Sequence, residues 1–255
     1  FISFLGAHGG KGEDKNNTCI QVQDNTLIDA GNILNSLGSE KSLKIDRIFL
    51  THSHMDHISD IPFLIDSVFS RRKTPIEIWG LKETIEVLKE SIFNWKVWPD
   101  FSSIPLIGQQ NSSIEFKTFE YNEKIELEEV ILTPIKAVHT VPCSGYVVTK
   151  KETGESLLIS GDTYKNKDLW DIINNDKSIK TAIIDVAFPS SFYQLGIDSQ
   201  HFTPKALEED VKEHSLREDV KLCVYHTKPS HYQMVVDDLN TLDIEQEIFV
   251  LHDQS

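Results

Sequence analysis

The chain has 255 residues, of which 39% are hydrophobic and 25% are charged, which is enough to bury the core of one soluble globular domain. A formal net charge of −15 makes the chain a poor candidate for binding duplex DNA or long RNA through its overall charge, because phosphate binding needs clustered lysine and arginine. Three scattered cysteines predict no disulfide framework, and no apolar run approaches transmembrane length.

The first thirty residues predict strands separated by a glycine-rich loop. Apolar patterns predict strands over residues 1–5, 18–22 and 26–31, with a turn at 24–25. The loop over residues 6–12 has no Lys-Ser/Thr after it, so it is not a phosphate-binding P-loop and reads as a flexible loop. Asp29 ends the third strand, where a carboxylate is often a turn former.

Residues 51–57 carry three histidines and an aspartate, directly after an apolar run over 45–50 that predicts a buried strand. Residues two apart on an extended backbone point to the same side, so His52 and His54 can reach one metal ion together. Asp56 and His57 follow the turn and can face a second ion. Neutral imidazole and carboxylate are ligands that zinc and related ions take, whereas a solvated polar loop has no reason for this spacing.

The middle of the chain predicts helices and an aromatic segment. Apolar spacing predicts a helix over residues 58–72, a strand over 76–80 and a helix over 81–94. Two tryptophans and two phenylalanines follow within residues 93–101. They either plug one end of the core, which is the commoner case, or form a wall on which Trp98 stacks a flat group.

Several later strands end at single polar side chains. Short strands over residues 102–136, and others over 144–148, 157–163, 179–187, 220–225 and 248–251, alternate with a helix from Thr203 to about His214. His139, Asp162 and His226 stand where strands end, a position at which such residues are usually structural or turn-forming. An aspartate held there can also bridge two metal ions about 4 Å apart.

The pattern His-x-His-x-Asp-His after a strand resembles the signature of the metallo-β-lactamase superfamily of hydrolases. This resemblance implies an α/β (α+β) fold, a four-layer αββα sandwich, with residues 1–255 as a single hydrolase domain. It also implies two divalent metal ions, zinc first, with manganese and iron as alternatives. The implied ligands are His52, His54 and His139 for one ion, Asp56, His57 and His226 for the other, and Asp162 for both, while Asp29 supports the metal-binding loop.

Further segments resemble the class II cyclic-nucleotide phosphodiesterase branch, among them Trp98-Pro99-Asp100-Phe101, Asp185-Val186-Ala187-Phe188-Pro189, His201-Phe202-Thr203-Pro204-Lys205 and His226-Thr227-Lys228-Pro229. The resemblance implies hydrolysis of a 3′,5′-cyclic nucleotide, cAMP or cGMP, by a metal-bridging hydroxide that attacks phosphorus. Asp56 and His201 are the expected catalytic residues; His201 either protonates the leaving oxygen or is a helix-start histidine satisfied by the backbone. Lys228 either contacts a phosphate oxygen or is simply solvated.

Other functions remain compatible with the same motifs. A tRNA 3′-processing nuclease of this superfamily would suit His139 and the Gly-Asp-Thr segment, but it needs a basic arm that the sequence lacks. Lactamase or thioester hydrolysis, and a non-catalytic metal or nucleotide sensor, rank lower. We therefore expect a small-molecule phosphodiester substrate, no extended nucleic acid and no membrane partner. The protein is expected to be soluble, in the cytoplasm or periplasm, and its oligomeric state is left open, a homodimer being compatible.

Overall fold

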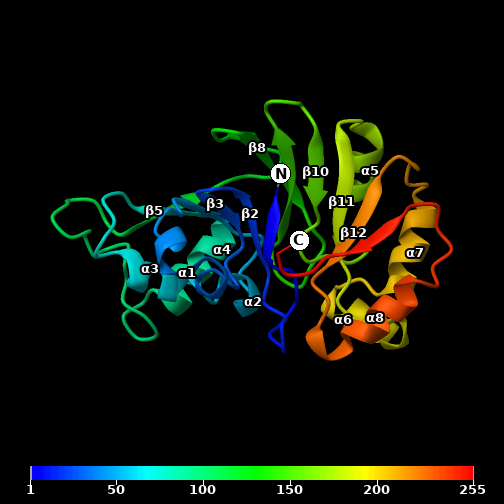
Figure 1. Cartoon of the computed structure of the whole chain (residues 1–255), viewed down its shortest axis with the longest axis horizontal. Helices are drawn as coiled ribbons and strands as arrows, with labels where there is room; N and C mark the ends of the chain where they lie inside the picture. The colour runs from blue at the N-terminus through cyan, green and yellow to red at the C-terminus, as the bar shows by residue number, and fades with distance from the viewer. Residues whose placement is uncertain (1, 255) are drawn as a thin grey trace. The chain divides into compact units, whose positions relative to one another are not determined.

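The computed structural model describes residues 2–254, which form two compact units, each built on one sheet (Figure 1). Unit 1 comprises residues 2–6, Asn16–Phe119 and 253–254. Unit 2 comprises Ala7–Lys15 and Glu120–His252. No helix in residues 2–254 combines the length and the apolar character needed to cross a membrane.

Unit 1 has a sheet with the strand order β1-β2-β3-β4-β5-β6, antiparallel from β1 to β3 and parallel from β3 to β6. Its strands are β1 (Ser3–Gly6), β2 (Cys19–Gln23), β3 (Thr26–Ile28), β4 (Arg47–Phe49), β5 (Ile76–Gly80) and β6 (Ile114–Thr118). Its helices are α1 (Leu34–Ser42), α2 (Met55–Ile58), α3 (Ile61–Val68) and α4 (Lys82–Val87), the last continued by a π-helical turn, Leu88–Ile92.

The core of unit 1 lies between this sheet and helices α3 and α4. Ile48 of β4 and Ile78 of β5 are fully buried in one cluster with Leu64 of α3 and Ile85 of α4. Because β3, β4 and β5 are parallel, their carboxyl ends meet at one edge of the sheet. The core therefore fixes the loops after β3 and β4 as neighbours, and these loops hold the aspartate and histidine motifs.

Unit 2 has a sheet with the order β13-β12-β11-β10-β9-β8-β7, parallel from β10 to β13 and antiparallel from β7 to β10. Its strands are β7 (Ile125–Glu126), β8 (Val130–Lys136), β9 (Ser144–Lys150), β10 (Ser156–Ile159), β11 (Ile179–Asp185), β12 (Lys221–Tyr225) and β13 (Ile248–Val250). Its helices are α5 (Lys167–Asn175), α6 (Tyr193–Ser199), α7 (Pro204–Glu213) and α8 (Tyr232–Leu239), with short 3₁₀ turns at Ser190–Phe192 and Pro229–His231.

The core of unit 2 is formed by one face of the sheet and the helices beside it in Figure 1. Alternate residues of β11 and β12, such as Ile184 and Val224, pack in one cluster with Trp170 of α5, Leu207 of α7 and Val235 of α8. Strands β8, β10, β11 and β12 all run in the same direction. Their carboxyl ends therefore share one edge, and each leads to a candidate site residue.

The structure confirms the predicted strands and corrects several helices. The helix expected over residues 58–72 is two short helices that break at Ser59 and Asp60. Asp60 does not cap its own helix but accepts the N–H groups of Ile33 and Leu34 at the start of α1, at 2.7 and 3.1 Å. Helices α1, α5 and α6 were not predicted. The helix expected from Thr203 is α7, and the Thr203 hydroxyl caps it by accepting the N–H of Ala206 at 3.3 Å.

Candidate metal centre and catalytic edge

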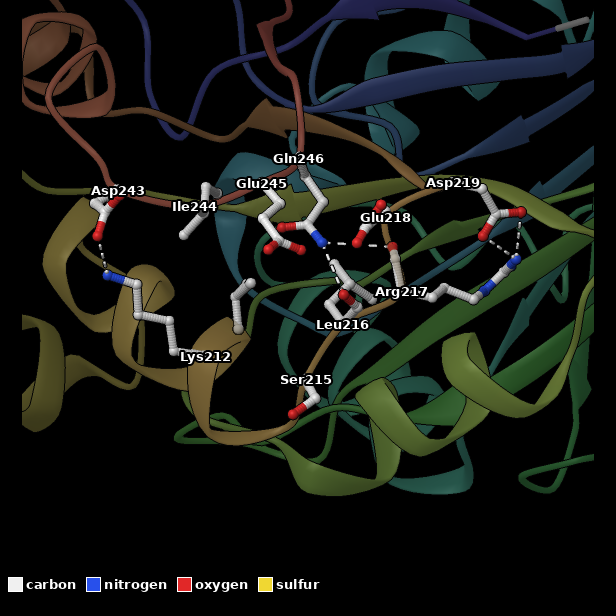
Figure 2. Close-up of a pocket in the computed structure, with 11 residues that line it drawn as sticks. Lys212, Ser215, Leu216, Arg217, Glu218, Asp219, Asp243, Ile244, Glu245 and Gln246 are labelled. Carbon is white, nitrogen blue, oxygen red and sulfur yellow. Dashed lines mark hydrogen bonds and ion pairs between the residues drawn. The ribbon is translucent and has the colours of Figure 1, made fainter.

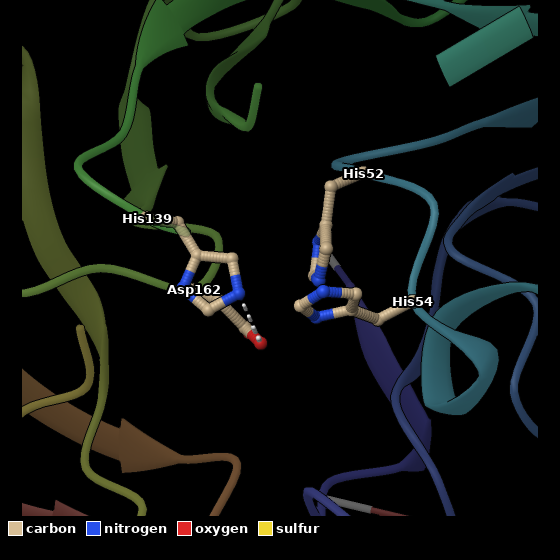
Figure 3. Close-up of side chains that lie close together, drawn as sticks. All are labelled: His52, His54, His139 and Asp162. Carbon is tan, nitrogen blue, oxygen red and sulfur yellow. Dashed lines mark ion pairs between the residues drawn. The ribbon is translucent and has the colours of Figure 1, made fainter. Parts of the chain in front are cut away.

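In unit 1 the loop after β4 brings the motif histidines together. The ring centroid of His52 lies 4.5 Å from that of His54 and 4.2 Å from that of His57. His54 stands at the start of α2, and Asp56 and His57 lie in its first turn. His52 and His57 are buried, whereas His54 and Asp56 are partly exposed. Figure 3 draws His52 and His54. Three imidazole rings and one carboxylate thus lie together at the carboxyl edge of the unit 1 sheet.

Asp29, which directly follows β3, is hydrogen-bonded to residues of this loop. Its carboxylate accepts the N–H of Thr51 at 2.8 Å and the Thr51 hydroxyl at 2.9 Å. The same carboxylate lies 2.7 Å from Nδ1 of His57. A carboxylate on Nδ1 orients the ring and leaves Nε2 as the nitrogen that can coordinate a metal.

Gly31, in the segment Asp29-Ala30-Gly31, stands at a position with no room for a side chain. A Cβ atom at Gly31 would lie 2.2 Å from the carbonyl oxygen of Asp56 and 2.8 Å from that of Thr18. Because backbone atoms cannot move aside as a flexible side chain can, any larger residue would displace the backbone at Asp56 and Thr18. Gly31 therefore permits the close approach of the loop after β3 to α2.

In unit 2 four buried side chains meet at the carboxyl edge of the sheet. Asp162, Asp185, His201 and His226 each offer a donor atom, and these atoms all lie within 4.8 Å of one another. Oδ2 of Asp162 is 3.3 Å from Nε2 of His226 and 4.0 Å from Nε2 of His139, the pair joined by the dashed line in Figure 3. Two imidazole nitrogens thus converge on one carboxylate oxygen, an arrangement suited to a shared cation.

Asp185 holds two of these histidines at once. One oxygen lies 2.7 Å from Nδ1 of His201 and accepts the N–H of Thr163 at 3.1 Å. The other lies 3.4 Å from Nδ1 of His226. Burial acts to raise the pKa of Asp185, but His201 and His226 together bring that pKa below its ordinary value. Since an ionised carboxylate only accepts, Nδ1 of His201 carries the proton, and Nε2 is the available edge of that ring.

His139 lies at the same edge, after β8. Its ring centroid is 4.9 Å from that of His201, and its Nδ1 is 3.3 Å from the carbonyl oxygen of Gln200. Burial lowers the pKa of His139 to about 4, although Asp162 acts in the opposite direction. The ring is therefore neutral at physiological pH, as a metal ligand must be.

The glycine-rich loop packs against His226. The N–H of His226 donates to the carbonyl of Ala7 at 2.7 Å, and the N–H of Gly9 donates to Thr227 at 3.3 Å. A Cβ atom at Gly9 would lie 2.6 Å from the His226 ring. The expectation of a flexible loop is therefore wrong for residues 7–9, which buttress a candidate ligand whose backbone adopts φ 64°.

The two remaining substrate candidates have mainly structural contacts. The backbone N–H of Lys228 donates to Ala187 at 3.0 Å, and its side chain is half-buried. Trp98 packs against the unit 1 core and meets Phe63 edge-to-face, with ring centroids 5.2 Å apart. Both substrate roles stay predictions.

A cavity of about 810 Å³ lies elsewhere in unit 2, beside the amino ends of β12 and β13 (Figure 2). Ion pairs line it, with Lys212 on Asp243 at 3.1 Å and Arg217 on Asp219 at 2.8 Å. None of the candidate site residues is among the described residues around it. Because ligands bind at the carboxyl ends of parallel strands, this cavity is not the expected active site.

A family model described as "cAMP phosphodiesterases class-II" matches residues 23–202. The chain belongs to this family. It is 26% identical over 133 residues to 3′,5′-cyclic-nucleotide phosphodiesterase 1 of Saccharomyces cerevisiae, covering 47% of this chain and 34% of that protein. It is 28% identical over 111 residues to ribonuclease Z of Pyrococcus abyssi, covering 43% and 33%. The chain thus spans about a third of the length of each of these relatives.

Solved structures share the fold. Unliganded yeast PDE1 superposes with a TM-score of 0.83 at 16% identity, over 98% of this chain and 96% of that one. The metallo-β-lactamase fold protein YhfI of Bacillus subtilis gives 0.76 at 17% identity, over 100% and 97%. These matches confirm the predicted fold class, and the family match confirms the predicted branch. The contacts of Asp185 with His201 and His226 were missed, because the three residues lie in different loops and no spacing in the sequence marks them as neighbours.

Proposed function

We propose that this class II family member is a metal-dependent phosphodiesterase that hydrolyses a 3′,5′-cyclic nucleotide, with residues 1–255 acting as a single domain. The observation that carries the proposal is the buried cluster of Asp162, Asp185, His201 and His226 at one sheet edge. Two buried carboxylates and two imidazoles this close are costly unless they bind a cation or handle protons. The family match supports a cyclic nucleotide as the substrate.

The donor set fits divalent ions, and we assign zinc, with manganese or iron as alternatives. In this proposal His52, His54 and His139 hold one ion, Asp56, His57 and His226 hold the second, and Asp162 contacts both. The fit rests on ring orientation: Asp29 lies 2.7 Å from Nδ1 of His57, and Asp185 lies 3.4 Å from Nδ1 of His226, so Nε2 is the nitrogen of each ring assigned to an ion. When bound, the ions neutralise phosphoryl oxygens and lower the pKa of a water molecule.

The protein side chains supply the proton chemistry. Asp185 keeps the proton of His201 on Nδ1, so a second proton on Nε2 can pass to the leaving oxygen of the substrate. The imidazolium is stabilised by the ionised Asp185 until transfer occurs. We assign a phosphate contact to Lys228, whose loop is tied to Ala187. Trp98 receives no assignment, because its contacts with Phe63 are those of a packing residue.

A ribonuclease Z activity is the second candidate, because ribonuclease Z proteins also match part of the chain. That activity requires binding of a folded RNA, which depends on lysine and arginine contacts to its phosphates. A net charge of −15 opposes RNA binding, so a small-molecule substrate is favoured.

The test is hydrolysis of cAMP, cGMP and bis(p-nitrophenyl) phosphate by purified protein of known metal content. We expect turnover of a cyclic nucleotide that a chelator abolishes and added zinc or manganese restores. Asp162→Ala should lose metal and hydrolysis together, whereas Asp237→Ala, which removes an exposed carboxylate of α8, should keep both. Cleavage of precursor tRNA without cyclic-nucleotide turnover would favour the nuclease, and bound metal with no turnover of any diester would favour a sensor.

A further inference from the structure

We propose that Phe188, Phe192 and His231 form the surface that binds the nucleobase of the substrate, an inference that rests on the proposed function. The three rings lie in two loops of unit 2, after β11 and after β12. Both loops begin at the edge that carries the catalytic cluster. The expected ligand is a flat heteroaromatic base attached to the ribose of a cyclic phosphodiester.

The rings form a continuous path away from the candidate catalytic histidine. The centroid of Phe188 lies 5.9 Å from that of His201 and 6.4 Å from that of His231. Phe192 meets His231 edge-to-face at 4.8 Å. In the other direction the His201 ring stacks on His226 at 5.3 Å. A substrate with its phosphodiester at His201 would therefore find aromatic surface next to the site.

These rings are not part of the protein core. Among the described residues, the buried core cluster of unit 2 includes none of the three. Phe188 and His231 are half-buried, and Phe192 is 37% exposed. A single exposed phenylalanine is unremarkable, but aromatic faces contiguous with a buried acid–base cluster are suited to stacking a base.

The two loops are held rigidly, so the surface exists before a ligand binds. The N–H of Lys228 donates to Ala187 at 3.0 Å, which ties one loop to the other. The hydroxyl of Thr227 donates to Val186 at 2.9 Å, a second tie between them. The N–H of Ser190 donates to the Asp238 carboxylate on α8 at 2.7 Å. Pre-formed loops lose little conformational entropy on binding, which favours affinity for a small ligand.

The test compares cAMP with ribose 3′,5′-cyclic phosphate, which has the same diester ring and no base. For Phe192→Ala and Phe188→Ala we expect KM for cAMP to rise roughly tenfold while kcat changes little, because stacking contributes mainly to binding. The parameters for the abasic substrate should not change. Phe249→Ala removes a ring of similar exposure, 39%, on the edge strand β13 and should behave as the wild type.

Equal effects on both substrates, or no effect on cAMP, would overturn the inference. Direct binding separates it from the proposed function: saturation-transfer NMR with AMP reports contact between base protons and the protein without turnover. Base contact that Phe192→Ala abolishes would support the base surface even if neither diester is hydrolysed. AMP binding that both alanine variants leave unchanged would refute the base surface even if cAMP is hydrolysed.

Discussion

Replacing Asp185 by asparagine tests the acid–base logic of unit 2 with almost no change in side-chain volume. One oxygen of the carboxylate accepts from Thr163 and from Nδ1 of His201, and the other lies 3.4 Å from Nδ1 of His226. An asparagine has a single acceptor oxygen, and its NH₂ group would face at least one N–H. One histidine must therefore change its tautomer or lose its partner, and the paired charge is lost as well.

The structure allows the size of the effect to be worked out. Asp185 is fully buried, and loss of its charge-assisted hydrogen bonds should cost about 3 kcal/mol of stability. For a chain of this size that corresponds to a fall in Tm of roughly 6–12 °C. Because the folded pKa of Asp185 is lowered, its contribution is present above the ordinary carboxyl pKa and fades as pH falls below it. The Tm difference between wild type and variant should therefore shrink toward acid pH.

The catalytic assay compares two substrates whose leaving groups differ in their need for a proton. A cyclic nucleotide releases an alkoxide that needs a proton from His201, so Asp185→Asn should lower kcat roughly 10²-fold. Bis(p-nitrophenyl) phosphate releases a stable anion and should be much less affected. His201→Ala should retain metal and show the same selectivity, and His252→Ala, an exposed histidine, serves as its control. Equal loss on both substrates with metal retained would refute the proton-donor role, and loss of metal from Asp185→Asn would show that it acts through His226.

Three further outcomes follow from single contacts. Gly9→Ala should weaken metal retention, measured by competition with a chelator, because its Cβ would overlap the His226 ring; unchanged affinity would contradict that overlap. Asp29→Ala should lower metal content, since His57 loses its Nδ1 partner, and full occupancy would argue against that support. Burial raises the pKa of Cys223 from 9.0 to about 11, so alkylation of the folded protein should accelerate only near pH 11, and stability should fall as pH rises above 9.

The clustering of the side chains in the histidine motif could be predicted from sequence because its information is local. His52, His54, Asp56 and His57 lie within six positions of one another and directly follow a strand. The strand period and the turn together determine which side they face. Asp185 carries no comparable local signal, because its function depends on histidines that the fold brings to it.

The missed helices have different physical reasons. Helix α1 contains Gly38 at φ 65°, which interrupts the helical backbone and weakens any periodic pattern. Helix α5 was detectable, because the Asn166 side chain accepts from Leu169 and an apolar spacing follows. Contacts such as that of Gly9 with His226 join opposite ends of the chain, and no single-sequence pattern encodes them.

The two units share one arrangement, in which an aspartate at a strand end lies beside a histidine ring. In each, an aspartate at the end of a parallel strand lies next to Nδ1 of a histidine from a neighbouring loop: Asp29 is 2.7 Å from His57, and Asp185 is 3.4 Å from His226. The strand determines the position of the carboxylate, and a carboxylate beside Nδ1 favours the histidine tautomer with its proton on that nitrogen. Nε2 of the histidine is then the nitrogen that is left to bind a metal ion. Asp185 differs in holding His201 as well, so the same carboxylate that orients a candidate ligand also prepares the candidate acid. Under the proposed function, metal binding and proton transfer in unit 2 would therefore be coupled through the Asp185 side chain, whereas Asp29 would only orient His57 and its loop.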